Sequence, residues 1–231
     1  MNTESEYDFK EGALLLFDKP YEWTSFDMVN KVRKRICSYL GVKKLKVGHA
    51  GTLDPLATGL LIICTGKATK TIDSYQAKEK EYVATLKLGA TTPSFDLETE
   101  IDKTFPTEHI DRALIDKELL NFVGELDQIP PAFSAVKVKG KRAYELAREG
   151  KTPELKPKKL VIKEIEVVDF KNDELVLRIV CSKGTYIRGL ARDIGYALKS
   201  GSHLTTLRRT RIGKYSVENT LSLEEFEKKL N

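Results

Sequence analysis

Hydrophobic residues recur at regular spacings along this chain, and the spacing predicts several β-strands. Leu14–Phe17 and Leu60–Cys64 are short, continuous apolar runs of the length of a buried strand, the first ending at Asp18-Lys19-Pro20. Residues 82–88 alternate, which places Tyr82, Ala84, Leu86 and Leu88 on one face of a strand. Residues 160–168 and 175–181 are predicted to pair around the turn residues Asn172-Asp173.

Other stretches carry their apolar residues at helical spacing. The first predicted helix begins at Thr24 or Ser25 and ends at Gly41, with the apolar positions Phe26, Val29, Val32, Ile36 and Leu40. Further helices are predicted over residues 110–123, 142–149 and 189–198. Ser222 and Glu225 form a capping box that starts a last helix.

The remaining segments are predicted to be loops or a tail. Residues 48–59 contain three glycines and a proline without a sustained period, and residues 91–109 are also loop-like. Hairpin-like and helical segments are mixed without a βαβ rhythm, so the fold class expected is α+β, with a central, mostly antiparallel sheet. Residues 1–11 are predicted to be a frayed tail and residues 12–231 a single domain.

Composition and charge narrow the class of protein. The chain is 41% hydrophobic and 32% charged, and no apolar run approaches a membrane span, so a soluble protein is expected. Three isolated cysteines and the lack of a signal peptide favour the reducing cytoplasm. The net charge is only +5, but residues 31–46 hold seven Lys or Arg and no acid. Residues 208–214 and 156–163 hold two further basic clusters, and the three together favour a polyanionic partner, although solvated helix faces and loops explain any single cluster better.

The segment 47–59, VGHAGTLDPLATG, carries the main candidate for chemistry. Asp54 precedes Pro55, which disfavours helical backbone at the aspartate, and the flanking glycines permit sharp bends. The residues alone therefore predict a carboxylate on a stiff loop beside an apolar strand. An Asp-Pro pair in an ordinary structural turn remains the alternative at this point.

The complete string GHAGTLDPLATG closely resembles the signature loop of the bacterial tRNA pseudouridine-55 synthase family. Further segments resemble the other motifs of that family in order, from residue 14 to 214: LLLFDKPYEWTS (14–25), KEYVATLKLG (80–89), IPPAFSAVKVKGKRAYELAREG (129–150), SKGTYIRGLARDIG (182–195) and LRRTRIG (207–213). The resemblance implies a pseudouridine-synthase-like catalytic domain that isomerises a uridine in the T-loop of tRNA, at position 55, after flipping the base out.

The resemblance also implies roles for individual residues. Asp54 is the implied nucleophile and Arg188 its ion-pair partner, while Tyr82 stacks on the uracil and belongs to the catalytic set. Tyr186, expected on the same strand face as Arg188, and Leu207 line the base site, and His49 contacts or replaces the flipped nucleotide. The further residues implied near the RNA, or placed there by charge, are Lys67, Lys70, Asp96, Arg208 and Arg209.

An isomerisation needs no cofactor, and the histidines and cysteines lack the spacing of metal ligands, so neither a cofactor nor a metal is expected. The expected partner is tRNA, bound by a monomer without a guide RNA and without a membrane. The family's small C-terminal RNA-binding domain is not found in the sequence after the last predicted helix. The alternatives are a tRNA-binding or tRNA-folding module without catalysis, the same chemistry on another RNA, including a guided relative of the dyskerin type, and a carboxylate hydrolase, for which a second carboxylate is not evident.

Overall fold

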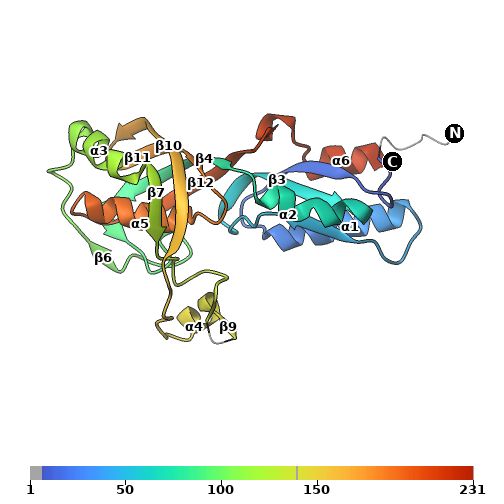
Figure 1. Ribbon diagram of the computed structural model, residues 1–231, viewed down its shortest axis with the longest axis horizontal. Coiled ribbons are helices and arrows are strands. Elements are labelled where there is room, and N and C mark those ends of the chain that lie inside the picture. Colours follow the sequence, from blue (N-terminus) through green and yellow to red (C-terminus); the bar gives the residue numbers. More distant parts are fainter. Residues whose placement is uncertain (1–6, 139, 231) are drawn as a thin grey trace. The chain divides into compact units, whose positions relative to one another are not determined.

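The computed structural model describes residues 7–138 and 140–230 and divides the chain into two compact units (Figure 1). Unit 1 comprises Met1–Lys80 and Arg208–Asn231, and unit 2 comprises Glu81–Leu207. Strands and helices are mixed in both units, which confirms the α+β class. None of the helices in these ranges is long and apolar enough to cross a membrane.

Unit 1 is built around the central strand β3 (Ala57–Thr65). β1 (Leu14–Lys19) pairs with β3 antiparallel along one side. The other side of β3 is occupied by β2 (Val47–Ala50) and by β12 (Ser202–Ile212), whose last five residues belong to this unit. The remaining elements of the unit are α1 (Ser25–Tyr39), η1 (Gly66–Thr71), α2 (Ile72–Gln76), β13 (Tyr215–Ser216), η3 (Val217–Asn219) and α6 (Leu223–Leu230).

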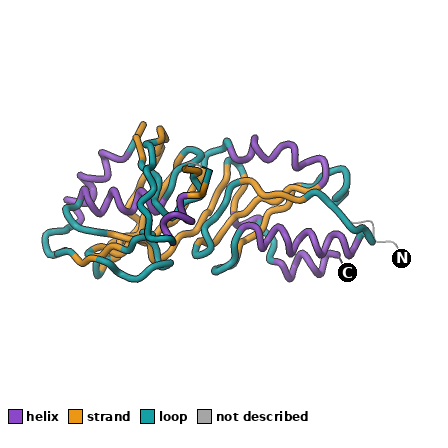
Figure 2. Tube along the Cα trace, turned by 90° about the horizontal axis from the view of Figure 1, so that it is seen from below, coloured by secondary structure: helices purple, strands orange, loops and turns teal. Residues whose placement is uncertain are grey.

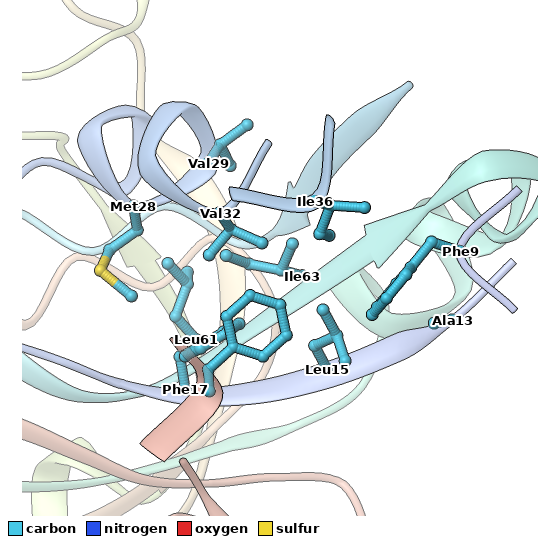
Figure 3. Close-up of a cluster of buried hydrophobic side chains, with 11 residues drawn as sticks. Phe9, Ala13, Leu15, Phe17, Met28, Val29, Val32, Ile36, Leu61 and Ile63 are labelled. Atoms are coloured by element: carbon cyan, nitrogen blue, oxygen red, sulfur yellow. The ribbon is translucent and has the colours of Figure 1, made fainter. Parts of the chain in front are cut away.

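β3 is buried on both faces, which explains its continuous apolar sequence. Leu61 and Ile63 face a cluster formed with β1, α1 and α6, and Figure 3 shows side chains of α1 packed over those of β1 and β3. Leu60, Ile62 and Cys64 face the opposite cluster, which includes side chains of α2 and β13. Two layers of side chains therefore hold β3, the strand that follows the Asp54 loop.

Unit 2 contains the strand order β12, β4, β11, β10, β7. The hairpin predicted around Asn172-Asp173 is confirmed, and both residues have positive φ angles of 52° and 62°. These angles suit a type I′ turn, whose twist matches that of the strands. The bounds of the unit's elements are β4 (Lys80–Leu88), β5 (Ala90–Thr91), β6 (Lys103–Thr104), α3 (Arg112–Leu119), η2 (Leu120–Phe122), β7 (Gly124–Gln128), β8 (Lys137–Val138), β9 (Lys141–Arg142), α4 (Ala143–Arg148), β10 (Lys158–Lys171), β11 (Glu174–Cys181) and α5 (Ile187–Ala197).

Within unit 2, α3 contacts both α5 and β10. Figure 1 shows the short elements β8, β9 and α4 projecting from this unit on the chain between β7 and β10, and Figure 2 shows α3 and α5 close to one another from a second direction. By these element bounds, the residues of unit 2 that resemble the synthase motifs lie on β4, on the segment after β7, and on α5 and the residues just before it.

Several predictions about local structure are confirmed, and others are wrong. Thr24 caps α1 with Asp27, and Ser222 and Glu225 form the predicted capping box of α6. The predicted loop 48–59 is shorter, because residues 47–50 form β2 and residues 57–59 begin β3. The predicted tail is described only from residue 7, and there Phe9 is 1% exposed within the core of unit 1.

Candidate active site

Asp54 lies in unit 1, on the short connection between β2 and β3. Its backbone carbonyl accepts a hydrogen bond from the Ala57 N–H at 3.0 Å, which closes a tight turn over Pro55. The preceding Leu53 is buried, with 3% of its surface exposed, so the loop is anchored on its apolar side. The half-buried aspartate is therefore presented from a short, stiff turn, as the sequence predicts.

Ser25, the first residue of α1, binds the loop next to the aspartate. Its hydroxyl accepts a hydrogen bond from the Leu53 N–H at 2.9 Å and donates one to the Leu53 carbonyl at 3.2 Å. One side chain thus satisfies both backbone groups of the residue before Asp54. Because Ser25 is only 2% exposed, water does not compete for these bonds.

Lys19, the last residue of β1, binds the loop on the other side of the aspartate. Its ammonium donates to the carbonyl of Pro55 at 3.1 Å and to those of Trp23 at 2.6 Å and Pro20 at 2.8 Å. Burial lowers the pKa of Lys19 to about 8, while the charge of Asp54 acts in the opposite direction and favours the ammonium. A buried cation and a candidate nucleophile therefore interact electrostatically in the same unit.

His49 lies on β2, five residues before Asp54. Its side chain is half-buried, and this burial is the main cause that lowers its pKa below the ordinary value of 6.5, followed by the positive charge of Arg209. The imidazole is therefore neutral at physiological pH. A neutral ring suits a position beside a flipped base better than it suits a phosphate contact.

The arginines of the closing motif form contacts within unit 1. Arg208 pairs with Asp18 at 2.6 Å and also contacts the hydroxyl of Thr58. Arg209 is 1% exposed and donates to backbone carbonyls. This burial does not fit the prediction that Arg209 contacts phosphate, because its guanidinium has no access to solvent.

The two lysines predicted near the RNA are exposed on η1. Lys67 forms an ion pair with Glu11 at 2.6 Å, in which both side chains are well exposed. No ion pair within the described parts of the chain involves Lys70. Both positions are accessible to RNA.

In unit 2, Arg188 is held by a buried set of acceptors. Its Nε lies 3.4 Å from a carboxylate oxygen of Asp96, and its two terminal nitrogens donate to the carbonyls of Ser94 at 3.2 Å and Phe133 at 3.0 Å. Arg188 is 5% and Asp96 6% exposed. Asp96 was predicted to lie near the RNA, and here it is the buried partner of an implied catalytic residue. Since Asp54 belongs to the other unit, the predicted pairing of Arg188 with Asp54 stays a prediction.

Tyr186 and Arg188 were predicted to lie on one face of a strand, and this is wrong. Tyr186 has extended backbone and precedes α5, and Arg188 lies in the first turn of that helix. The Gln128 side chain accepts from the Tyr186 N–H at 2.9 Å and donates to the Tyr186 carbonyl at 3.1 Å. This bidentate contact fixes the point at which the backbone turns into the helix.

The other two predicted base contacts are also in or near the interior of unit 2. Tyr82 is 8% exposed and lies on the inward face of β4, where the alternating pattern predicts it. Leu207 on β12 is half-buried. Within the described ranges, no group of three or more His, Cys, Asp or Glu side chains has the arrangement of a metal site.

Sequence reasoning missed the residues that hold the site. Lys19, Ser25 and Gln128 act through backbone groups far away in the sequence, and no local pattern encodes those partners. One signal was present for Lys19: at strand spacing it follows the apolar positions Leu15 and Phe17, which are buried in β1. A lysine at that place in a strand requires buried acceptors.

Comparisons with known proteins agree with this arrangement. Residues 35–187 match the family described as TruB family pseudouridylate synthase (N terminal domain), and residues 188–231 match the tRNA pseudouridylate synthase B C-terminal domain. A protein of Phocaeicola vulgatus named tRNA pseudouridine synthase B is 64% identical over 95% of this chain and 93% of its own length. A protein of the same name from Thermobifida fusca is 44% identical over 92% of this chain and 73% of its own length.

Solved structures also resemble the chain. A Cbf5-Nop10-Gar1 complex contains a chain that is 28% identical, with a TM-score of 0.69, over 95% of this chain and 54% of that chain. An H/ACA RNP bound to a substrate RNA containing 2'-deoxyuridine contains another, at 26% identity and a TM-score of 0.67 over the same share of this chain and 53% of that one. The matches to the family models and the 64% identity to a tRNA pseudouridine synthase B agree with one another. The chain therefore belongs to the TruB family of pseudouridylate synthases.

Proposed function

We propose that this protein isomerises the uridine at position 55, in the T-loop of tRNA, to pseudouridine. The observation that carries the proposal is the Asp54 loop, bound through its backbone by buried Ser25 and Lys19, in a chain 64% identical to a tRNA pseudouridine synthase B. The reaction breaks the bond between N1 and C1′, turns the uracil and joins C5 to C1′. C5 loses a proton and N1 gains one, so atoms and charge balance without a cofactor.

Asp54 is the nucleophile in this proposal. The rigid turn reduces the entropy that is lost when the carboxylate meets its target, and such orientation is a major source of rate enhancement. Arg188 is the proposed counter-ion of Asp54, and Asp96 and two carbonyls orient its guanidinium.

Tyr82, Tyr186 and Leu207 hold the flipped base in the proposed complex. Stacking of one base on an aromatic ring contributes about 1–3 kcal/mol. Neutral His49 contacts the nucleotide or fills the space that the base leaves. These contacts offset the cost of taking the uridine out of its stack, which amounts to a few kcal/mol.

Exposed lysines of unit 1 supply the proposed contacts to phosphates. Lys67 and Lys70 are accompanied by four exposed lysines that form no ion pair within the described parts of the chain: Lys34, Lys43, Lys44 and Lys46. Each phosphate that a lysine neutralises releases counter-ions, which makes binding depend on salt. Arg208 contributes less in this proposal, because Asp18 already compensates its charge.

The enzyme acts as a monomer and without a guide RNA in this proposal, although the Cbf5 complex resembles it in fold. The higher identity to a protein named tRNA pseudouridine synthase B than to the matching chain of the Cbf5-Nop10-Gar1 complex, 64% against 28%, supports this choice. The three free cysteines fit a reducing cytoplasm. Light scattering after size-exclusion chromatography should give the mass of one chain, and a dimer mass would contradict the monomer.

The function is tested with purified protein and a tRNA transcript that carries tritium at C5 of its uridines. Wild type should release tritium without an added guide RNA, and Asp54→Asn should release none while it still binds the transcript. Asp73→Asn is the matched control, because Asp73 is an exposed aspartate of the same unit, and it should react at the wild-type rate. Turnover by Asp54→Asn would refute the nucleophile, and a wild type that binds without releasing tritium would favour a tRNA-binding or tRNA-folding module.

A further inference from the structure

Arg209 is the largest of the fully buried side chains, although it was expected to face RNA. It lies on β12, within the residues of unit 1, and only 1% of its surface is exposed. Removing a guanidinium from water is costly unless hydrogen bonds replace the lost hydration. The contacts of Arg209 therefore indicate why the chain retains a charge in its interior.

The hydrogen bonds of Arg209 reach both ends of the Asp54 loop. Its Nη2 donates to the carbonyl of Gly51 at 3.0 Å, three residues before Asp54. Its Nε donates to the carbonyl of Leu60 at 2.8 Å, six residues after Asp54. One planar fork thus fixes the separation between the chain entering the loop and the chain leaving it.

The backbone of Arg209 lies against the same loop. Gly59 has a φ of +103°, and a Cβ built there would lie 2.3 Å from the Arg209 carbonyl oxygen. Only glycine permits this approach, so the backbones of β3 and β12 lie in close contact at this point. The backbone and the side chain of one residue both restrain the loop.

Arg209 also acts electrostatically on two side chains beside the loop. Its charge lowers the pKa of His49, in addition to the larger effect of burial. It likewise opposes protonation of Lys19, whereas the charge of Asp54 favours it. Replacing Arg209 by a neutral residue should therefore raise the pKa of His49.

The neighbouring arginines are compensated differently. Arg208 pairs with Asp18 and Arg211 pairs with Glu79 at 2.9 Å, both at partly exposed positions. The acceptors of Arg209 are backbone carbonyls instead. A neutral side chain of similar length could fill that space, but it could not span the two carbonyls as the fork does.

We propose that Arg209 is a positioning residue for the nucleophile, whose fork between Gly51 and Leu60 fixes where the Asp54 carboxylate is presented. This inference rests on the proposed function of Asp54. It predicts a defect in the chemical step rather than in RNA binding, because the side chain is shielded from any RNA.

The test compares Arg209→Gln and Arg209→Lys with the control Arg112→Gln, at an exposed arginine of α3 that pairs with Asp116. Single-turnover tritium release at saturating enzyme measures the chemical step, and filter binding measures the Kd for tRNA. Arg209→Gln should lower the rate about 100-fold, the size expected for a displacement of about 1 Å, with its Kd within about threefold of wild type. Arg209→Lys keeps the charge and can restore one of the two hydrogen bonds, so its rate should lie between those of Arg209→Gln and wild type. Arg112→Gln should keep the wild-type rate.

A second readout keeps the inference testable if Arg209→Gln folds poorly. The imidazole proton resonances of the three histidines can be followed by NMR against pH in wild type and in Arg209→Lys. Lysine keeps the charge, so the pKa of His49 should stay near the wild-type value while the rate falls. A wild-type rate in both variants, or a weakened Kd with an unchanged rate, would overturn the inference. Turnover by Asp54→Asn would instead refute the proposed nucleophile, so the two failures are distinguishable.

Discussion

Replacing Ser25 by alanine tests whether the hydrogen bonds between Ser25 and the Asp54 loop contribute to both the stability and the reaction rate. The substitution removes one hydroxyl and, with it, the two hydrogen bonds to the backbone of Leu53. Ser25 is 2% and Leu53 3% exposed, so the N–H and C=O of Leu53 lose their partner in the interior. Nothing else about the helix changes, because Thr24 remains the N-cap.

The magnitude follows from the two groups left unsatisfied. A buried polar group without a partner costs about 1–3 kcal/mol, so the loss of two partners by Ser25→Ala should lower the free energy of unfolding by about 2–6 kcal/mol. In the folded fraction the loop is less constrained, so the single-turnover rate should fall while the Kd for tRNA stays close to that of wild type. The exposed Ser38 lies on the same helix, and Ser38→Ala should change neither quantity.

Urea unfolding followed by tryptophan fluorescence measures the stability change. Trp23 is the single tryptophan of the chain and packs against the main core cluster of unit 1, so it reports on the unit that carries the loop. Single-turnover tritium release provides the rate. A stability loss no greater than that of Ser38→Ala, or a wild-type rate despite a large loss, would refute the argument that this hydroxyl positions the nucleophile.

Three further predictions concern the neighbouring contacts. Because burial lowers the pKa of Lys19 from 10.5 to about 8, the unfolded chain binds more protons than the folded chain between these pH values. This group should therefore make the free energy of unfolding rise with pH across that window, by up to about 3 kcal/mol, and urea titrations of Lys19→Met should lack the rise. Gly59→Ala should lower the melting temperature far more than Gly41→Ala, because both glycines have positive φ but only Gly59 faces a backbone atom at 2.3 Å, and equal losses would show that φ alone matters. Asp96→Asn removes the carboxylate of Asp96 from buried Arg188 and should cost about 3 kcal/mol and lower the single-turnover rate, whereas an unaffected rate would separate this pair from catalysis.

Much of the fold could be predicted because it depends on local patterns. The two faces of β3, the alternation in β4 and the type I′ turn at Asn172-Asp173 follow from periodicity and turn chemistry. The exception in α1 shows how periodicity misleads at a helix end. Phe26 was counted among the apolar positions at helical spacing, yet it is 61% exposed, and Met28 is buried instead.

The geometry of the helix explains this exchange. Met28, Val32 and Ile36 are spaced by four residues and lie on one face, whereas Phe26 is six residues before Val32 and is rotated by roughly 240° from it. The apolar character of Phe26 groups it with the buried positions of the helix, but its rotation around the helix axis places it away from the buried face. The candidate site was less predictable for another reason, since Lys19 and Ser25 are linked to the Asp54 loop only by long-range bonds to the backbone.

The arginines of the closing motif show how charge patterns must be interpreted in this protein. Three arginines within four residues suggest a phosphate-binding cluster, yet Arg208 and Arg211 are paired with carboxylates and Arg209 is buried against carbonyls. Arg209 therefore contributes order to the loop, and the carboxylate partners of Arg208 and Arg211 reduce the charge that these two add to the surface. Residues 31–46, which contain no acid, keep exposed lysines without ion pairs within the described chain, so these side chains add positive charge to the surface. A basic cluster thus indicates a polyanionic partner only after the charges compensated inside the fold have been subtracted.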